Sequence, residues 1–211
     1  MSRLRPILLG SVLGVIAAGA RAGSSELAAG GGLLPGQQLL RAQPESVVRR
    51  LLDAKLLVLD EAGEMVRAFV LFDRPVGRVF ELLAATDRQG EFRSELEGLA
   101  TVEQLPDGHV DEHHIRILFV EVGYRLRYRL DPAQQRIHWE LDPSFESPMR
   151  RIEGSWELFA MDPTHTLGRF STLVDVGKAL PAFLEDAVTR RTLPSTLERC
   201  RRWVNADGVL P

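Results

Sequence analysis

The sequence predicts an α+β protein in which an antiparallel sheet and a long C-terminal helix occupy separate parts of the chain. Between residues 98 and 176, apolar and polar residues alternate in several runs, and turn signals such as Pro106-Asp107-Gly108 separate them. From Pro181 to Asn205, apolar residues instead recur at spacings of three and four, which is typical of a helix. Helices segregated from an antiparallel sheet define the α+β class.

The alternating runs predict a sheet with one packed face and one charged face. In the clearest run, Tyr124, Leu126, Tyr128 and Leu130 share a face, and arginines occupy the positions between them. Three further runs follow the same period of two: Ile137, Trp139 and Leu141; Ile152, Gly154, Trp156 and Leu158; and Phe170, Thr172, Val174 and Val176. Such a pattern indicates strands buried on one side only.

Shorter elements precede this sheet. Helical spacing of valines and leucines predicts a helix over Pro44 to Lys55, and Met65 to Phe72 is expected to be a strand. Proline at a first helical position opens an amphipathic helix over Val76 to Thr86, and a second short helix is expected from Arg88 to Leu96. Within the C-terminal helix, Pro194 is expected to produce a kink or a division.

The N-terminus has the pattern of an export signal. Arg3 and Arg5 precede an apolar run too short for a typical membrane span, and Ala20-Arg21-Ala22 forms a cleavage site of small residues. We therefore expect residues 1–22 to be a signal peptide cut after Ala22, so that the protein is periplasmic or secreted. An uncleaved membrane anchor is the alternative. Residues 23–43 are expected to be flexible and 44–208 to form the ligand-binding domain.

Composition restricts the partners of the protein. A net charge of −3 and a pI near 6.0 give no basic footprint, so nucleic acid is not an expected partner. The single cysteine, Cys200, excludes an internal disulfide and a multi-cysteine metal site. Arginines on the outer side of the last helix leave a peripheral membrane contact open. The oligomeric state is not predicted.

Three stretches of the sequence resemble the START-like (SRPBCC) superfamily, and in particular its polyketide cyclase/dehydrase-like and coenzyme Q-binding-like members. They are Phe72 to Asp87, with its strand, proline and amphipathic helix; Gly154-Ser155-Trp156-Glu157-Leu158; and Val174-Asp175-Val176-Gly177 leading into Pro181. The resemblance implies a helix-grip fold, in which a curved antiparallel sheet wraps around the long C-terminal helix. It also implies an elongated cavity between sheet and helix that holds an apolar or amphipathic molecule.

The candidate ligand-binding residues are the aromatic side chains of the strands and the last helix, together with one histidine. Most of the aromatic residues share the packed face of the predicted sheet, and tyrosine hydroxyls need polar partners. His113 shares the parity of Ile115 and Ile117 and can point inward as a polar group. The full set is His113, Phe119, Tyr124, Tyr128, Trp139, Phe145, Trp156, Phe170 and Phe183.

The histidine-rich run His109-Val-Asp111-Glu-His113-His114 is a weaker candidate for chemistry. On a strand, His109, Asp111 and His113 share a face, as two-histidine, one-carboxylate metal sites require. Because residues two apart on a strand are separated by roughly 6.6 Å, the two histidines lie too far apart for one ion. We interpret the run as a polar strand end and expect neither a metal nor a cofactor.

The sequence thus predicts non-catalytic carriage or sequestration of a lipid, a quinone or a polyketide-like molecule. Nucleophile and phosphate-binding motifs are missing from the sequence. Two alternatives stay open. One is a cyclase or dehydratase that uses His113 or Tyr128 for proton transfer on a polyketide-like substrate. The other is an interaction module whose cavity is filled by side chains.

Overall fold

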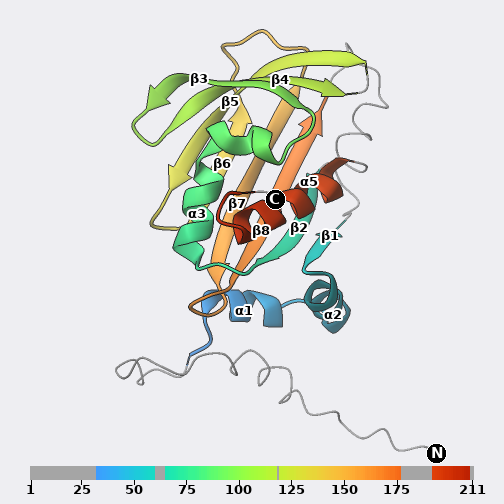
Figure 1. Cartoon of the computed structure of the whole chain (residues 1–211), viewed down its shortest axis with the longest axis vertical. Coiled ribbons are helices and arrows are strands. Elements are labelled where there is room, and N and C mark those ends of the chain that lie inside the picture. Colours follow the sequence, from blue (N-terminus) through green and yellow to red (C-terminus); the bar gives the residue numbers. More distant parts are fainter. Residues whose placement is uncertain (1–31, 60–64, 118, 177–191, 210–211) are drawn as a thin grey trace, which may run out of the picture. The chain divides into compact units, whose positions relative to one another are not determined.

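An eight-stranded antiparallel sheet forms the centre of the molecule (Figure 1). The computed structural model describes residues 32–59, 65–117, 119–176 and 192–209. The strands are β1 (Leu56–Leu59), β2 (Met65–Phe72), β3 (Leu96–Leu105), β4 (Gly108–Ile117), β5 (Val120–Asp131), β6 (Arg136–Leu141), β7 (Arg151–Ala160) and β8 (Thr166–Asp175). Their order across the sheet is β1-β2-β8-β7-β6-β5-β4-β3. The predicted α+β class and the predicted antiparallel sheet are confirmed.

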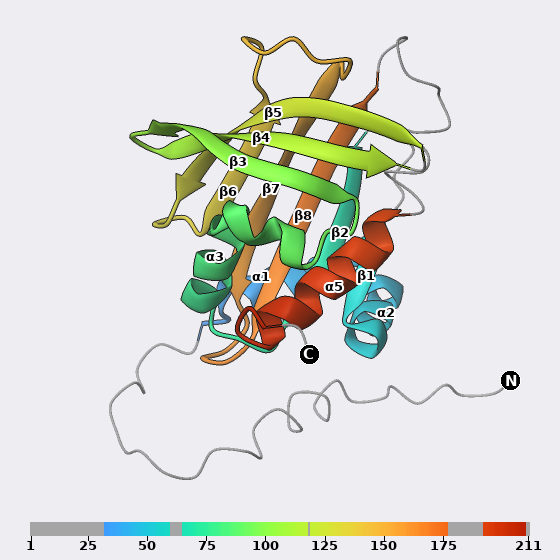
Figure 2. The same cartoon turned by 45° about the horizontal axis from the view of Figure 1, so that its top comes forward.

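The sheet is strongly curved. Figure 2 shows β3, β4 and β5 crossing above the helices, whereas β6, β7, β8 and β2 run steeply behind them. The pairing of β3 with β4 shifts register between Leu96 and Gly98 and again between Thr101 and Glu103. Such bulges bend a strand and increase its twist. The curvature gives the sheet a concave face, on which the main core is built.

Alternation along the strands decides what each face of the sheet buries. The concave face carries the predicted apolar parity, with Tyr124, Leu126 and Tyr128 of β5 buried beside Trp139 of β6 and Trp156 of β7. The opposite residues form ion pairs across neighbouring strands, for example Arg125 with Glu112 and Arg129 with Glu140. The half-wetted sheet expected from the sequence is therefore present.

A second, smaller core lies on the opposite face near the β1 edge. Helices α1 (Pro35–Arg41) and α2 (Glu45–Ala54) bury Leu51, Leu57, Phe69 and Leu167 there. Gly36 of α1 lies so close to Met161 and the β7 backbone that an added Cβ would clash with them. Residues 35–41, which were expected to be flexible, are therefore a packed helix, and the compact unit begins at Leu33.

Within the described part of the chain, three helical elements cover the concave face: α3 (Val76–Ala84), the 3₁₀ helix η1 (Thr86–Glu91) and α5 (Leu193–Asn205). The expected helix over 88–96 is wrong, because the turn ends at Glu91 and β3 already begins at Leu96. Of the C-terminal helix predicted over 181–205, the described part is α5. Pro194 lies in its first turn, where a missing N–H costs nothing.

The C-terminal end of α5 is anchored to both η1 and the sheet. Trp203 is fully buried, and its Nε1–H donates to Glu91 Oε2 over 2.8 Å. The Arg88 guanidinium lies 5.0 Å from the Trp203 ring centre. Asn205 exchanges two hydrogen bonds with Asp73, which directly follows β2. These contacts fix the helix against the curved sheet and leave its N-terminal half beside the cavity described below.

Candidate ligand-binding site

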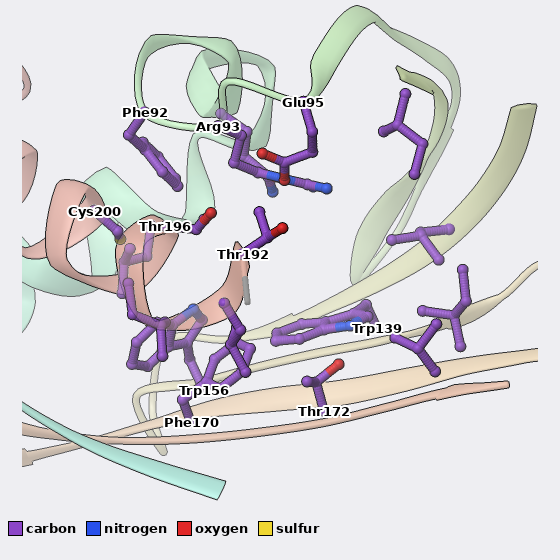
Figure 3. Close-up of a pocket in the computed structure, with 18 of the residues that line it drawn as sticks. Phe92, Arg93, Glu95, Trp139, Trp156, Phe170, Thr172, Thr192, Thr196 and Cys200 are labelled. Carbon is purple, nitrogen blue, oxygen red and sulfur yellow. The ribbon is translucent and has the colours of Figure 1, made fainter. Parts of the chain in front are cut away.

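A cavity of about 510 Å³ lies between the concave face of the sheet, the segment from η1 to β3 and the first turns of α5. Five aromatic residues predicted from the sequence line it: Tyr124, Tyr128, Trp139, Trp156 and Phe170. Figure 3 shows Trp139, Trp156 and Phe170 along the sheet wall, Thr196 and Cys200 contributed by α5, and Thr192 just before that helix. The strand alternation therefore brings together residues that are up to 46 positions apart in the chain.

Most of the cavity wall is apolar and closely packed. Trp156 and Phe170 lie with ring centres 4.9 Å apart, and Trp139 lies 5.7 Å from Phe170. Gly154 faces Trp139 across the β6–β7 pair. A Cβ added at Gly154 would clash with the Trp139 indole, so a larger residue would not fit there. Burial raises the pKa of the Cys200 thiol to about 12, so this group is neutral at physiological pH. The part of the cavity lined by Trp139, Trp156, Phe170 and Cys200 therefore suits an apolar ring or chain.

The other end of the cavity is polar and is organised by Arg93. The Arg93 guanidinium donates from Nε to Glu95 Oε1 over 2.9 Å, from Nη1 to Gln89 Oε1 over 2.8 Å and from Nη2 to the Tyr124 hydroxyl over 3.5 Å. Gln89 in turn donates from Nε2 to the Tyr128 hydroxyl over 3.2 Å. Figure 3 shows Arg93 and Glu95 side by side at this end of the cavity.

Burial and charge set the protonation of this polar end. Burial lowers the pKa of Arg93, but interactions with Tyr124 and Glu95 outweigh it and raise that pKa above its ordinary value. Burial raises the pKa of Tyr128 above its ordinary value. Arg93 is therefore a cation paired with Glu95, and Tyr128 keeps its hydroxyl proton at neutral pH.

His113 lies behind the cavity wall rather than in it. Its side chain is fully buried and stacks on Tyr124, with ring centres 5.1 Å apart and ring planes 7° apart. Neither ring nitrogen has a hydrogen-bond partner among the residues that the structure describes. Burial, together with the nearby charge of Arg93, lowers the pKa of His113 to about 3. His113 supports a cavity tyrosine as a neutral ring.

His109 and Asp111 form a closed hydrogen-bond cluster deep under η1. The Thr86 hydroxyl donates to Asp111 Oδ2 over 2.6 Å and lies 2.6 Å from His109 Nε2, and Thr101 donates to Asp111 Oδ1 over 2.7 Å. Although burial raises the pKa of Asp111, the hydrogen bonds from His109, Thr86 and Thr101 keep it below its ordinary value. The expected polar strand end is instead a buried cluster, because η1 folds over it.

Besides His113, three more of the predicted site residues are not seen in the cavity. Phe119 lies in the hairpin connection between β4 and β5, where the strand alternation no longer holds, and its side chain is 80% exposed. Phe145 follows β6 and is half-buried under the Arg125 guanidinium, 4.5 Å from its ring centre and on the charged face. Phe183 lies outside the described residues.

The polar residues of the site were missed from the sequence. Gln89, Arg93 and Glu95 belong to a charged segment that was expected to form a short helix from Arg88 to Leu96. Nothing in their local pattern distinguishes them from solvated residues, because the folded-over strands β3 to β5 bury them. Among the described residues, no cluster of three histidine, cysteine, aspartate or glutamate side chains is arranged to hold a metal ion. No described helix is long and apolar enough to cross a membrane.

Comparison with known proteins identifies the fold of the chain. No protein-family model and no curated protein sequence matches the chain. Similar solved structures include the Zhui aromatase/cyclase from a Streptomyces species, with 21% identity, a TM-score of 0.56, and coverage of 69% of this chain and 98% of that chain. A START superfamily protein from Mycobacterium smegmatis has 16% identity, a TM-score of 0.58, and coverage of 68% and 99%.

A third similar structure is a STAR-related lipid transfer protein from Xanthomonas axonopodis, with 13% identity, a TM-score of 0.53, and coverage of 71% of this chain and 98% of that chain. The structural match covers almost the whole length of each of these three chains. The chain therefore has the START-like, helix-grip fold that the sequence resemblance predicted.

Proposed function

We propose that this protein binds a hydrophobic or amphipathic small molecule, such as a lipid, a quinone or a polyketide-like compound, between its sheet and α5. The observation that carries the proposal is the aromatic-walled cavity of about 510 Å³ on the concave face. Its volume lies within the range of about 300–1,000 Å³ that is usual for ligand pockets. The solved structures with this fold include a lipid transfer protein and an aromatase/cyclase, which supports a bound apolar molecule.

The proposed role is carriage or sequestration rather than catalysis. A general base must lie within hydrogen-bonding reach of the proton that it removes. His113 is fully buried and does not line the cavity, so it is withdrawn from any bound molecule. Tyr128 does line the cavity and is the residue through which the cyclase or dehydratase alternative can be tested.

We further propose that the protein is exported and that it is cut after Ala22. The support is the sequence pattern of residues 1–22, with two arginines before an apolar run and a small-residue site. N-terminal sequencing of the protein recovered from its producing cells tests this proposal. A mature chain that begins at Gly23 is expected, and a chain that keeps residues 1–22 would instead indicate the membrane-anchored alternative.

Native mass spectrometry of the purified protein, followed by organic extraction, tests the binding proposal. A stoichiometric adduct that is released as an apolar compound is expected. A bare mass that does not change after incubation with lipids and quinones would contradict the proposal and favour the interaction module with a filled cavity.

A cavity-filling variant sharpens this test. Thr196 lines the cavity from α5 (Figure 3), so T196F should fill part of it and reduce the adduct at least about tenfold. The matched control is S195F, since Ser195 is the neighbouring residue on the same helix but is exposed to solvent. S195F should keep the adduct. Equal loss in both variants would mean that the helix, and not the cavity, had been damaged.

A further inference from the structure

We propose that the cavity takes a neutral ligand that carries a hydroxyl group, and that this hydroxyl donates to Glu95 and accepts from Tyr124. The inference rests on the proposed function and adds the chemical class of the ligand's polar end. It follows from which atoms of the polar end have partners and which do not.

Glu95 supplies the first half of the argument. Its Oε1 accepts from Arg93, whereas its Oε2 is buried and has no donor among the described residues. A buried carboxylate oxygen without a donor costs about 1–3 kcal/mol or more, so a donor is expected there. Glu95 lines the cavity, and the last torsion of a glutamate side chain is soft, so a small rotation presents the oxygen to a ligand. A ligand that carries an N–H or O–H would supply this donor.

Arg93 does not donate to this oxygen in the structure, and its charge is already paired. Its nitrogens donate to Glu95 Oε1, Gln89 and Tyr124, although Nη1 and Nη2 each carry a second N–H. Its positive charge is balanced by Glu95. An anionic head group placed here would meet a second carboxylate with no uncompensated cation, which is unfavourable in a site of low polarity. The charges therefore favour a neutral head.

Tyr124 supplies a donor at the polar end of the cavity. Because its hydroxyl oxygen accepts the Arg93 hydrogen bond, its own proton is directed elsewhere, and no described residue accepts that proton in a hydrogen bond given by the structure. Tyr124 lines the cavity, and its hydroxyl is therefore a candidate donor to a ligand oxygen. An alcohol or a phenol can both accept from Tyr124 and donate to Glu95 through a single oxygen atom. The aromatic walls formed by Trp139 and Trp156 favour a ring system beside it.

A matched ligand series tests the inference on the full chain. The probes are 2-naphthol, 2-methoxynaphthalene, 2-naphthoate and naphthalene, with binding measured by titration calorimetry at pH 7. We expect 2-naphthol to bind at least about tenfold more tightly than each of the others, because only it makes both hydrogen bonds. Equal binding of 2-naphthol and 2-methoxynaphthalene, or tightest binding of 2-naphthoate, would overturn the hydroxyl inference and leave the proposed function standing. Binding of none of the probes would overturn both.

The variant E95Q adds a change of specificity that damage to the fold would not produce. Removing the carboxylate charge leaves Arg93 unbalanced, so the affinity for 2-naphthoate relative to 2-naphthol should rise about tenfold or more. The matched control is E103Q, since Glu103 is exposed on β3. An unchanged ratio in folded E95Q would overturn the inference. If E95Q does not fold, the order of affinities of the unmodified protein for the four probes tests the inference by itself.

Discussion

Two buried polar clusters lie on the same concave face, and they differ in completeness. Around Asp111, both carboxylate oxygens are occupied, by Thr86 and Thr101, and His109 joins the same network. Around Glu95, one carboxylate oxygen is occupied and the other is buried without a donor from the described residues. The first cluster is closed by the chain itself, whereas the second lies at the edge of a cavity.

The difference separates a structural role from a binding role. A closed buried network stabilises one arrangement of the strands and η1, and it gains nothing from a ligand. An incomplete network carries a desolvation penalty that a matching ligand can remove. Variants of the first cluster should therefore change the free energy of unfolding, and variants of the second should change affinity and specificity. The following predictions test that separation.

The largest effect is expected from D111A. This substitution removes the acceptor of the hydroxyls of the buried Thr86 and of Thr101, together with the partner of His109, so the free energy of unfolding should fall by about 3 kcal/mol. Urea denaturation followed by fluorescence measures the change. The control is E103A, which removes an exposed carboxylate from β3 and should cost less than about 0.5 kcal/mol. A cost for D111A no greater than that of the control would show that the cluster does not stabilise the fold.

The effect expected from H113F is smaller at pH 7 and depends on pH. The pKa of His113 is about 3 in the folded protein, below its ordinary value of 6.5. The unfolded chain therefore binds a proton first, and stability that is complete above pH 6.5 is lost as the pH falls towards 3, by about 1.4 kcal/mol per pH unit. Arg93, His109, His114 and Asp111 are the charged or titratable groups that act on this pKa.

H113F should remove that slope and leave stability at pH 7 within about 1 kcal/mol, because the imidazole nitrogens make no hydrogen bond to described residues. Unfolding curves at pH 7, 6, 5 and 4 measure it. The control H114Q changes the neighbouring, exposed histidine on the opposite face and should keep the slope. Identical slopes in H113F and the unmodified protein would contradict the low pKa.

The smallest effect is expected from Y128F. The Tyr128 hydroxyl accepts one hydrogen bond, from Gln89, so its loss should weaken 2-naphthol binding by less than about tenfold. Y124F removes the proposed ligand donor and should weaken binding more, and the two variants are compared in the same calorimetric titration. If the protein proves to turn over a substrate and Y128F lowers that rate roughly 100-fold or more, the cyclase or dehydratase alternative gains support.

Strand alternation was enough to predict five cavity aromatics, because the direction of a side chain on a strand is set by its nearest neighbours in the chain. Alternation predicted that Phe119 lines the cavity, but its side chain is exposed, because β4 and its alternation end at Ile117. It also failed for Phe145, which lies in the connection after β6, and for His109 and Asp111, whose burial depends on η1.

The sequence by itself determined the α+β class, the antiparallel strands and the apolar face of the sheet, because local periodicity and turn residues encode these features. Only the tertiary structure decided that Arg93 and Glu95 form the polar end of a cavity. The sequence predicts only a short helix for their segment, and its place beside the cavity results from β3, β4 and β5 curving over the concave face. A position's environment then depends on strands distant in sequence, which no local pattern of residues records.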